Sequence, residues 1–187
     1  MVSKAFAHFQ VTQPAIWIGA AVLTCVITCT LLCCQKTARS VPTNYILLFV
    51  FTVCEAYLVG MICSSIQDQE IVLMAAAMTL AVTLALTIYA LTTKTDFTMC
   101  GGFFFVGTML LLMFGLFYFI YPSKVMYNMY CIGGVLLYGF YLIYDTQLIA
   151  GGKRYELSMD DYVIGALMLY IDIIQMFLYI LQLLSKK

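Results

Sequence analysis

Long apolar stretches alternate with short polar connections along the whole chain. Six stretches reach the length of about 20 residues that a helix needs to cross the hydrocarbon core of a bilayer. They cover residues 14–34, 44–66, 70–92, 99–120, 126–150 and 161–184. Inside lipid the backbone must satisfy its own hydrogen bonds, and the chain lacks the apolar–polar alternation of a membrane β-barrel. The pattern predicts an all-α, polytopic membrane helix bundle with six spans in a single transmembrane domain, residues 1–187.

The composition narrows the class of protein further, since 64% of the residues are hydrophobic and only 10% are charged. Soluble domains carry about 25% charged residues, so we expect the lipid bilayer to surround this chain. Nine basic residues balance nine acidic ones, which argues against a nucleic-acid partner. The motifs G-x-S-x-G and H-E-x-x-H do not occur, and the single histidine is His8. We therefore expect neither enzyme activity nor a cofactor.

Basic residues in the connections give a weak indication of orientation. If all six stretches cross, one side collects Lys36, Arg39, Lys94, Lys153 and Arg154, and the other Lys4, Lys124, Lys186 and Lys187. Lys and Arg are in excess on the cytosolic side of membrane proteins, so the first, third and fifth connections are slightly favoured to face the cytosol. Lys186 and Lys187 argue the other way, and would fit better if the last segment re-entered the membrane instead of crossing it.

Eight cysteines raise the question of disulfides or metal sites. Cys25, Cys29 and Cys33 are spaced by four and share one helical face, which is typical of small residues where membrane helices approach closely. The pair Cys33-Cys34 precedes Gln35-Lys36 at a membrane edge, which also fits palmitoylation. No CxxC pair is present, so zinc or thioredoxin-like chemistry has no support.

Three acids lie away from the ends of the predicted spans: Glu55 in the second, Asp145 in the fifth and Asp172 in the sixth. Placing a carboxylate there costs about 2.5–3.5 kcal/mol on insertion scales, so these side chains are candidates for function. Two carboxyls close together in a low dielectric cannot easily both ionise, and they would share a proton and titrate as a unit. Calcium takes six to eight oxygens, so Asp145, Asp172 and Glu55 with carbonyls and water would form a weak transit site for that ion.

Spacing alone leaves contact between the two aspartates open. Asp145 is five residues before the end of its stretch, and Asp172 is eleven beyond Asp161. At 1.5 Å per residue their depths differ by roughly 9 Å if both helices start at one level. The two acids meet only if the last helix begins well above the membrane edge. The alternative for each acid is a structural hydrogen bond to a Tyr, Thr or Gln on a neighbouring helix.

Several motifs resemble those of the transmembrane BAX-inhibitor-motif family. They are Phe97-Thr98-Met99-Cys100, Tyr144-Asp145-Thr146-Gln147-Leu148, Asp161–Leu167 and Tyr170–Ile174. Cys33-Cys34-Gln35, followed by Arg39, Pro42 and Asn44, is similar to the lifeguard subgroup, which includes the glutamate-receptor-associated protein. The similarity runs from about residue 20 to the end and is most specific in the last third.

The resemblance implies a calcium leak across internal membranes, sensitive to pH through an aspartate pair that Asp145 and Asp172 match. It also implies suppression of apoptosis in the endoplasmic reticulum, Golgi, endosomal or plasma membrane, with Arg39 as a basic partner near the cytosolic edge. Family members have seven helices, usually after a cytosolic tail, and the stretches here match the second to the seventh. We therefore expect a form that lacks the family's first helix and tail.

Three functions remain open on the sequence. The first is a pH-sensitive calcium leak channel with an anti-apoptotic role, in which Asp145, Asp172 and Glu55 line the ion path and the two aspartates contact calcium transiently. The second is a proton-coupled transporter, which would use the same acids and need a second solute. The third is a non-conducting protein that restrains death signalling by binding membrane proteins.

Overall fold

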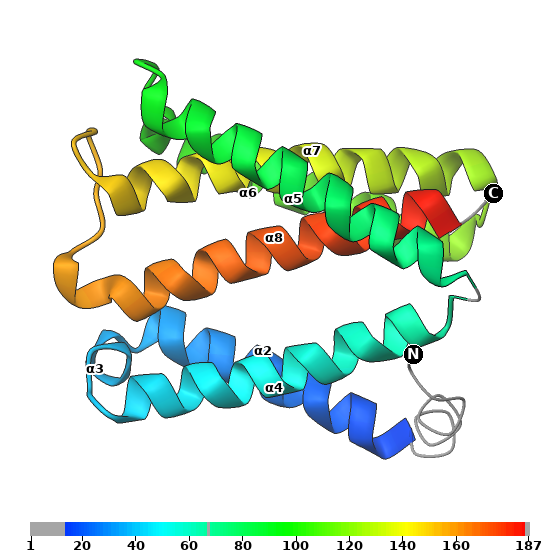
Figure 1. Ribbon diagram of the computed structural model, residues 1–187, viewed down its shortest axis with the longest axis horizontal. Helices are drawn as coiled ribbons and strands as arrows, with labels where there is room; N and C mark the ends of the chain where they lie inside the picture. The colour runs from blue at the N-terminus through cyan, green and yellow to red at the C-terminus, as the bar shows by residue number, and fades with distance from the viewer. Residues whose placement is uncertain (1–13, 67, 186–187) are drawn as a thin grey trace. The chain divides into compact units, whose positions relative to one another are not determined.

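The computed structural model describes residues 14–66 and 68–185, and the regular secondary structure in that part of the chain consists of helices (Figure 1). Its long helices are α2 (Pro14–Cys33), α4 (Thr43–Ser64), α5 (Gln69–Thr92), α6 (Gly101–Ile120), α7 (Lys124–Ala150) and α8 (Tyr162–Ser185). The short ones are α3 (Gln35–Ala38) and two 3-10 turns, η1 (Phe97–Cys100) and η2 (Met159–Asp161). Across the described ranges, six helices are long and apolar enough to cross a membrane.

The all-α prediction and its six spans are thereby confirmed, and each expected end lies within two residues of an observed one. Agreement is this close because the bilayer fixes how many apolar residues a span needs, and the sequence shows that length directly. His8, Lys4, Lys186 and Lys187 lie outside the described residues. The orientation of the chain stays a prediction.

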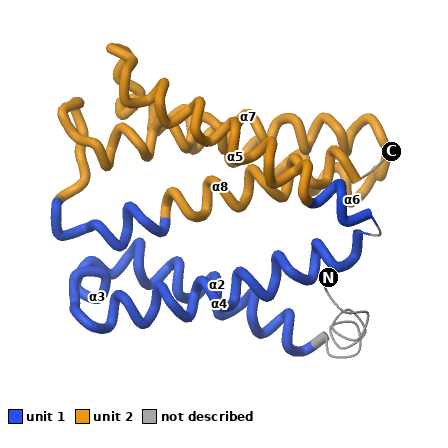
Figure 2. Tube along the Cα trace, viewed as in Figure 1, with its two compact units in different colours: residues 1–72, 159–167 blue, residues 73–158, 168–187 orange. Residues whose placement is uncertain are grey.

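The chain forms two compact units, each assembled from two separate segments (Figure 2). Unit 1 comprises residues 1–72 and 159–167, and unit 2 comprises residues 73–158 and 168–187. Helices α5 and α8 therefore each contribute residues to both units. The expectation of a single transmembrane domain stays a prediction.

In unit 1, α2 packs against α4, and α3 lies in the connection between them. Leu31 of α2 and Phe51 of α4 are completely buried in this packing. Asn44 is also fully buried, and its side-chain amide donates to the Ala38 carbonyl at 3.0 Å and to the Tyr162 hydroxyl at 3.3 Å. A buried amide needs such partners, because leaving it unpaired costs about 1–3 kcal/mol.

A bidentate ion pair joins the α3–α4 connection to the turn that precedes α8. Arg39 Nε donates to Asp161 Oδ1 and the terminal guanidinium nitrogen to Oδ2, both at 2.7 Å. The two residues are 122 positions apart, and both belong to unit 1. Side-chain exposure is 40% for Arg39 and 11% for Asp161, so the pair lies at the polar edge of the unit. Its two parallel bonds fix orientation as well as distance.

In unit 2, α6 packs against α7, and tyrosines tie α7 to its neighbours. The hydroxyls of Thr108 and Tyr141 lie 2.9 Å apart, which joins α6 to α7. Tyr127 donates to Gln182 Oε1 at 2.8 Å, and the hydroxyls of Tyr130 and Tyr179 lie 3.1 Å apart, which joins α7 to α8. Polar bonds between helices add to van der Waals packing where lipid supplies no hydrophobic drive.

Gly134 allows α7 and α8 to approach at Tyr179. A Cβ at Gly134 would lie 2.6–2.7 Å from carbons of the Tyr179 ring. That ring cannot turn away freely, because it stacks on Tyr138 at 5.9 Å and its hydroxyl is bonded to Tyr130. At the preceding residue, Gly133, a Cβ would lie 3.5 Å from Leu111, which is an ordinary contact.

We expect Gly134→Ala to lower the free energy of unfolding by about 1–3 kcal/mol, because overpacking a filled site forces neighbours to shift. Thermal unfolding in detergent micelles would measure the loss. Gly133→Ala is the matched control, and it should leave the midpoint near that of the wild type. Equal midpoints for the two variants would contradict the close approach of Gly134 and Tyr179.

Candidate functional site

Asp145 of α7 and Asp172 of α8 come together inside unit 2. Each side chain is only 4% exposed, and the two carboxyl groups are close enough to share a hydrogen bond. If both helices started at one level, the two acids would differ in depth by roughly 9 Å. The structure does not show that separation. Contact requires α8 to begin farther from the membrane centre than the point where α7 ends. Contact between the two acids, which their spacing in the sequence left undecided, is therefore present in the structure.

The pair has few polar partners besides itself. Asp145 Oδ1 and Asp172 Oδ2 are buried and have no hydrogen-bond partner, and no basic group pairs with either acid within residues 14–66 and 68–185. The adjacent Thr146 hydroxyl donates instead to the Leu142 carbonyl at 2.6 Å. An unpaired charge in such surroundings is costly, so a shared proton is the arrangement that removes most of the penalty.

Two phenols of α7 interact electrostatically with the pair. Tyr138 interacts electrostatically with Asp172, and Tyr144 with Asp145. Tyr138 also stacks on Tyr179 of α8, so it belongs to the tyrosine cluster that joins these helices. A phenol carries no positive charge at neutral pH, and these neighbours therefore do not neutralise an ionised pair.

Gln147, one helical half-turn beyond Asp145, is the residue that sequence reasoning left without a role. It is 1% exposed, and its Nε2 donates to the Ala90 carbonyl at 3.2 Å and to the Thr95 carbonyl at 3.0 Å. Its Oε1 accepts from the Phe97 backbone N–H at 2.8 Å. One side chain thus ties α7 to the end of α5 and the start of η1. The sequence did contain one indication of this role, because an amide inside an apolar stretch needs hydrogen-bond partners.

Two connections of unit 2 are bonded together beside Gln147. Asp96 accepts from the Thr98 hydroxyl at 2.6 Å and from the Arg154 backbone N–H at 3.1 Å. Lys153 Nζ donates to the Thr93 carbonyl at 3.1 Å. The segment after α7 reaches these partners by a sharp turn in which Gly151 and Gly152 have φ of 71° and 72°, a region that favours glycine. The end of α7 is therefore fixed to the α5–η1 connection.

The other predicted site residues lie in unit 1. Glu55 is half-buried on α4, and Arg39 is bound to Asp161 as described above. Sequence reasoning did not find Asp161 as the partner of Arg39, because a pairing across 122 positions leaves no local pattern. A part for Glu55 in an ion path, and for Arg39 as a basic partner near the cytosolic edge, remains a prediction.

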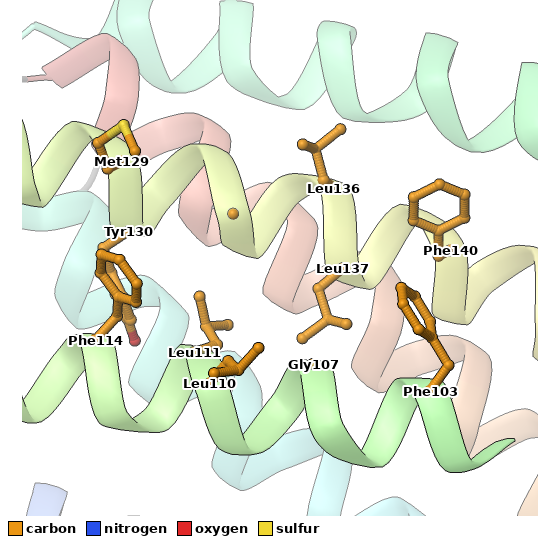
Figure 3. Close-up of a pocket in the computed structure, with 11 residues that line it drawn as sticks. Phe103, Gly107, Leu110, Leu111, Phe114, Met129, Tyr130, Leu136, Leu137 and Phe140 are labelled. Atoms are coloured by element: carbon orange, nitrogen blue, oxygen red, sulfur yellow. The ribbon is translucent and has the colours of Figure 1, made fainter. Parts of the chain in front are cut away.

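An apolar groove between α6 and α7 has a volume of about 370 Å³ (Figure 3). Its walls include Phe103 and Phe114 of α6 and Leu136 and Phe140 of α7, which are exposed and therefore face lipid in a membrane. No charged side chain lines it. The groove is consequently unsuited to carrying an ion and is separate from the acidic pair.

Comparison with known proteins agrees with the resemblance carried by the motifs. The family described as "Inhibitor of apoptosis-promoting Bax1" matches residues 1–187. Human protein lifeguard 3 is 37% identical over 162 residues, which cover 84% of this chain and 51% of that protein. Mouse protein lifeguard 3 is 35% identical over 165 residues, with 84% and 52% covered. Mouse protein lifeguard 4 is 38% identical over 144 residues, with 77% and 58% covered. The chain spans about half the length of the lifeguard 3 proteins it matches.

We expect Gln147→Leu to lower the free energy of unfolding by about 1–3 kcal/mol, because the variant leaves buried backbone groups without partners. Gln147→Glu should cost more at neutral pH, since a carboxylate would face the Ala90 and Thr95 carbonyls. Chemical unfolding in detergent would rank the variants. Gln175→Leu, at a half-buried position of α8, is the control and should change stability less. A Gln147→Leu protein as stable as that control would contradict the role assigned to these bonds.

Asp96, outside the spans, should make stability depend on pH in the acid range. The hydrogen bond from the Thr98 hydroxyl lowers the pKa of this carboxyl below its usual 3.8, with smaller contributions from backbone N–H groups and Lys153. A lowered pKa in the folded state stabilises the fold above pH 3.8, and this contribution is lost as the pH falls further. Unfolding midpoints measured across that range should therefore fall less steeply for Asp96→Asn than for the wild type. The exposed Asp68→Asn variant should follow the wild type, and an Asp96→Asn curve identical to both would refute the assignment.

Proposed function

The chain belongs to the family of inhibitors of apoptosis-promoting Bax1, which includes the lifeguard proteins, and from this premise we propose that it is a pH-sensitive calcium leak channel with an anti-apoptotic role. It is an integral membrane protein with six apolar helices in the described ranges. The observation that carries the proposal is the buried contact between Asp145 and Asp172. We assign it to internal membranes, those of the endoplasmic reticulum, Golgi or endosomes.

In the closed state the two aspartates share one proton. A carboxyl that donates to a carboxylate forms a short, charge-assisted hydrogen bond, which holds α7 against α8. The bond also limits the pair to one negative charge in surroundings where a second would be expensive. The hydrogen bond of the protonated pair therefore links α7 to α8.

Loss of that proton removes the hydrogen bond and leaves two carboxylates that repel each other. Two like charges at hydrogen-bond distance repel strongly where the dielectric constant is low. Gln147 ties α7 to α5 and η1 close to Asp145, so the adjustment falls mainly on α8. Movement of Asp172 away from Asp145 would admit water and present two carboxylates to a cation.

Calcium enters this scheme as the transported ion. The pair supplies two carboxylates, and the described residues contain no cluster of three or more His, Cys, Asp or Glu side chains that could hold a metal. Calcium takes six to eight oxygens, so water and backbone carbonyls, with Glu55 if it lines the same path, would complete the shell. Such incomplete coordination suits brief contact during passage better than storage.

The anti-apoptotic role follows from the same activity in this proposal. A slow leak lowers the calcium content of an internal store, and a smaller store releases less calcium when a death signal opens it. The names of the family and of the lifeguard relatives agree with such a role. Binding to membrane proteins of apoptosis signalling is the competing explanation, and it requires no flux.

We expect purified protein in liposomes to pass calcium, with more flux at neutral than at mildly acidic pH. Asp145→Asn and Asp172→Asn should each reduce the flux at neutral pH and remove most of its pH dependence, because an amide cannot create the repelling pair. A fluorescent calcium indicator inside the vesicles would measure the rates. Asp68→Asn, the same substitution at an exposed connection, should behave as the wild type.

The possible results separate the proposed functions. Wild-type rates and pH dependence in both aspartate variants would remove these acids from the mechanism. Absence of flux at every pH from correctly inserted protein would favour the non-conducting interaction protein. Flux that requires a proton gradient and a second solute would favour the proton-coupled transporter.

A further inference from the structure

Two adjacent cysteines end the first long helix of unit 1. Helix α2 finishes at Cys33, and Cys34 has φ −109° and ψ 78°, outside the helical region, before α3 begins at Gln35. Both thiols are exposed. The packing of α2 against α4 therefore leaves this pair uncovered, and the break in the helix at Cys34 makes the backbone there locally irregular.

The pair lies at the level where the chain leaves the hydrocarbon. The apolar span ends at Cys33, and the next residues include the exposed Lys36 and the ion-paired Arg39. Arg39 is held by the bidentate contact with Asp161, which fixes a polar group only a few residues from the cysteines. The two thiols are thus at the boundary between lipid and water, where membrane-bound enzymes can reach them.

The direction of the Cys33 side chain suits a hydrocarbon substituent. The Cα–Cβ bonds of a helix tilt toward its N-terminus, so Cys33 points back along α2 into the membrane. The same face continues through Cys29, Val26 and Val22, all of which are exposed. A linear chain attached to Cys33 would lie along this face, where the neighbouring Thr30 hydroxyl is already bonded to the Val26 carbonyl at 2.7 Å.

We propose that Cys33 and Cys34 are S-acylated by a long-chain fatty acyl group donated by an acyl-coenzyme A thioester. The cysteine thiolate attacks the acyl carbonyl carbon, and the new carbon–sulfur bond forms as the bond to the coenzyme A sulfur breaks. The thiol proton ends on the released coenzyme A, so the exchange needs neither an oxidant nor a reductant. Juxtamembrane cysteines are the usual targets of this reversible modification.

The chain contains its own control for this proposal. Cys25 and Cys29 are exposed on the same helix, but they lie roughly 12 Å and 6 Å deeper than Cys33 along the helix axis. A thiol at those depths is out of reach of a reaction at the membrane surface. The small-residue spacing of Cys25, Cys29 and Cys33 favours helix packing on this face, and an acyl chain at Cys33 would occupy it instead.

The side of the membrane is part of the inference. Acyl-coenzyme A is a cytosolic reagent, so the connection between α2 and α4 must face the cytosol. The excess of basic residues in the first, third and fifth connections favours that orientation. Modification at Cys33-Cys34 and a cytosolic connection therefore stand or fall together.

The test is an acyl-exchange assay on the full chain expressed in mammalian cells. Free thiols are blocked with N-ethylmaleimide, thioesters are cleaved with neutral hydroxylamine, and the released thiols are tagged with a polyethylene glycol maleimide. We expect up to two hydroxylamine-dependent mass shifts in the wild type, and one at most in Cys33→Ser or Cys34→Ser. The double variant Cys33→Ser/Cys34→Ser should show none, whereas Cys25→Ser/Cys29→Ser should match the wild type.

Two results of the acyl-exchange assay would overturn the proposal. One is a wild-type chain without any hydroxylamine-dependent shift, and the other is a shift that persists in Cys33→Ser/Cys34→Ser. Equal membrane yield and elution volume of the two double variants would show that the loss of the tag is not a loss of fold. In sealed microsomes, a membrane-impermeant maleimide should label the released thiols from outside, and labelling only after permeabilisation would also refute the assignment.

Discussion

A carboxyl group inside a membrane must have a partner, and in unit 2 the partner of one acid is another acid. Asp145 and Asp172 are buried together, and each has an oxygen with no other hydrogen-bond partner. A salt bridge at this place would be insensitive to mild changes in pH, because Arg and Lys keep their protons. A pair of acids has no permanently charged partner, and a shared proton is the arrangement that removes most of the cost of burying it.

The helices α7 and α8, which carry the two acids, are held by different hydrogen bonds. Gln147, Asp96 and Lys153 bind the end of α7 to backbone atoms of the α5–η1 connection and of the loop after α7. On α8, the bonds to α7 come from Tyr179 and Gln182, about two and three helical turns beyond Asp172. The bonds of Gln147 thus lie beside Asp145 on α7, whereas the bonds from Tyr179 and Gln182 lie farther along α8 from Asp172.

The sequence predicts the elements of this fold better than it predicts their contacts. Span ends are accurate because the bilayer sets apolar length. Contact between Asp145 and Asp172 could not be decided from the sequence, because it depends on the level at which α8 begins, and spacing along the chain does not give that level. Gln147 was not found because its partners are backbone atoms, which look the same at every residue. The sequence shows its motif, Tyr144-Asp145-Thr146-Gln147, but does not indicate what Gln147 binds.

The position of the two acids on consecutive helices bears on how the protein is made. A ribosome completes α7, with Asp145, before it has synthesised α8. An isolated acid in a nascent span costs about 2.5–3.5 kcal/mol to insert, and its partner is still inside the exit tunnel. Helices α7 and α8 therefore gain by leaving the translocon together as a hairpin. A product terminated before residue 172 would carry an acid with no counterpart, which makes it a natural target for membrane quality control.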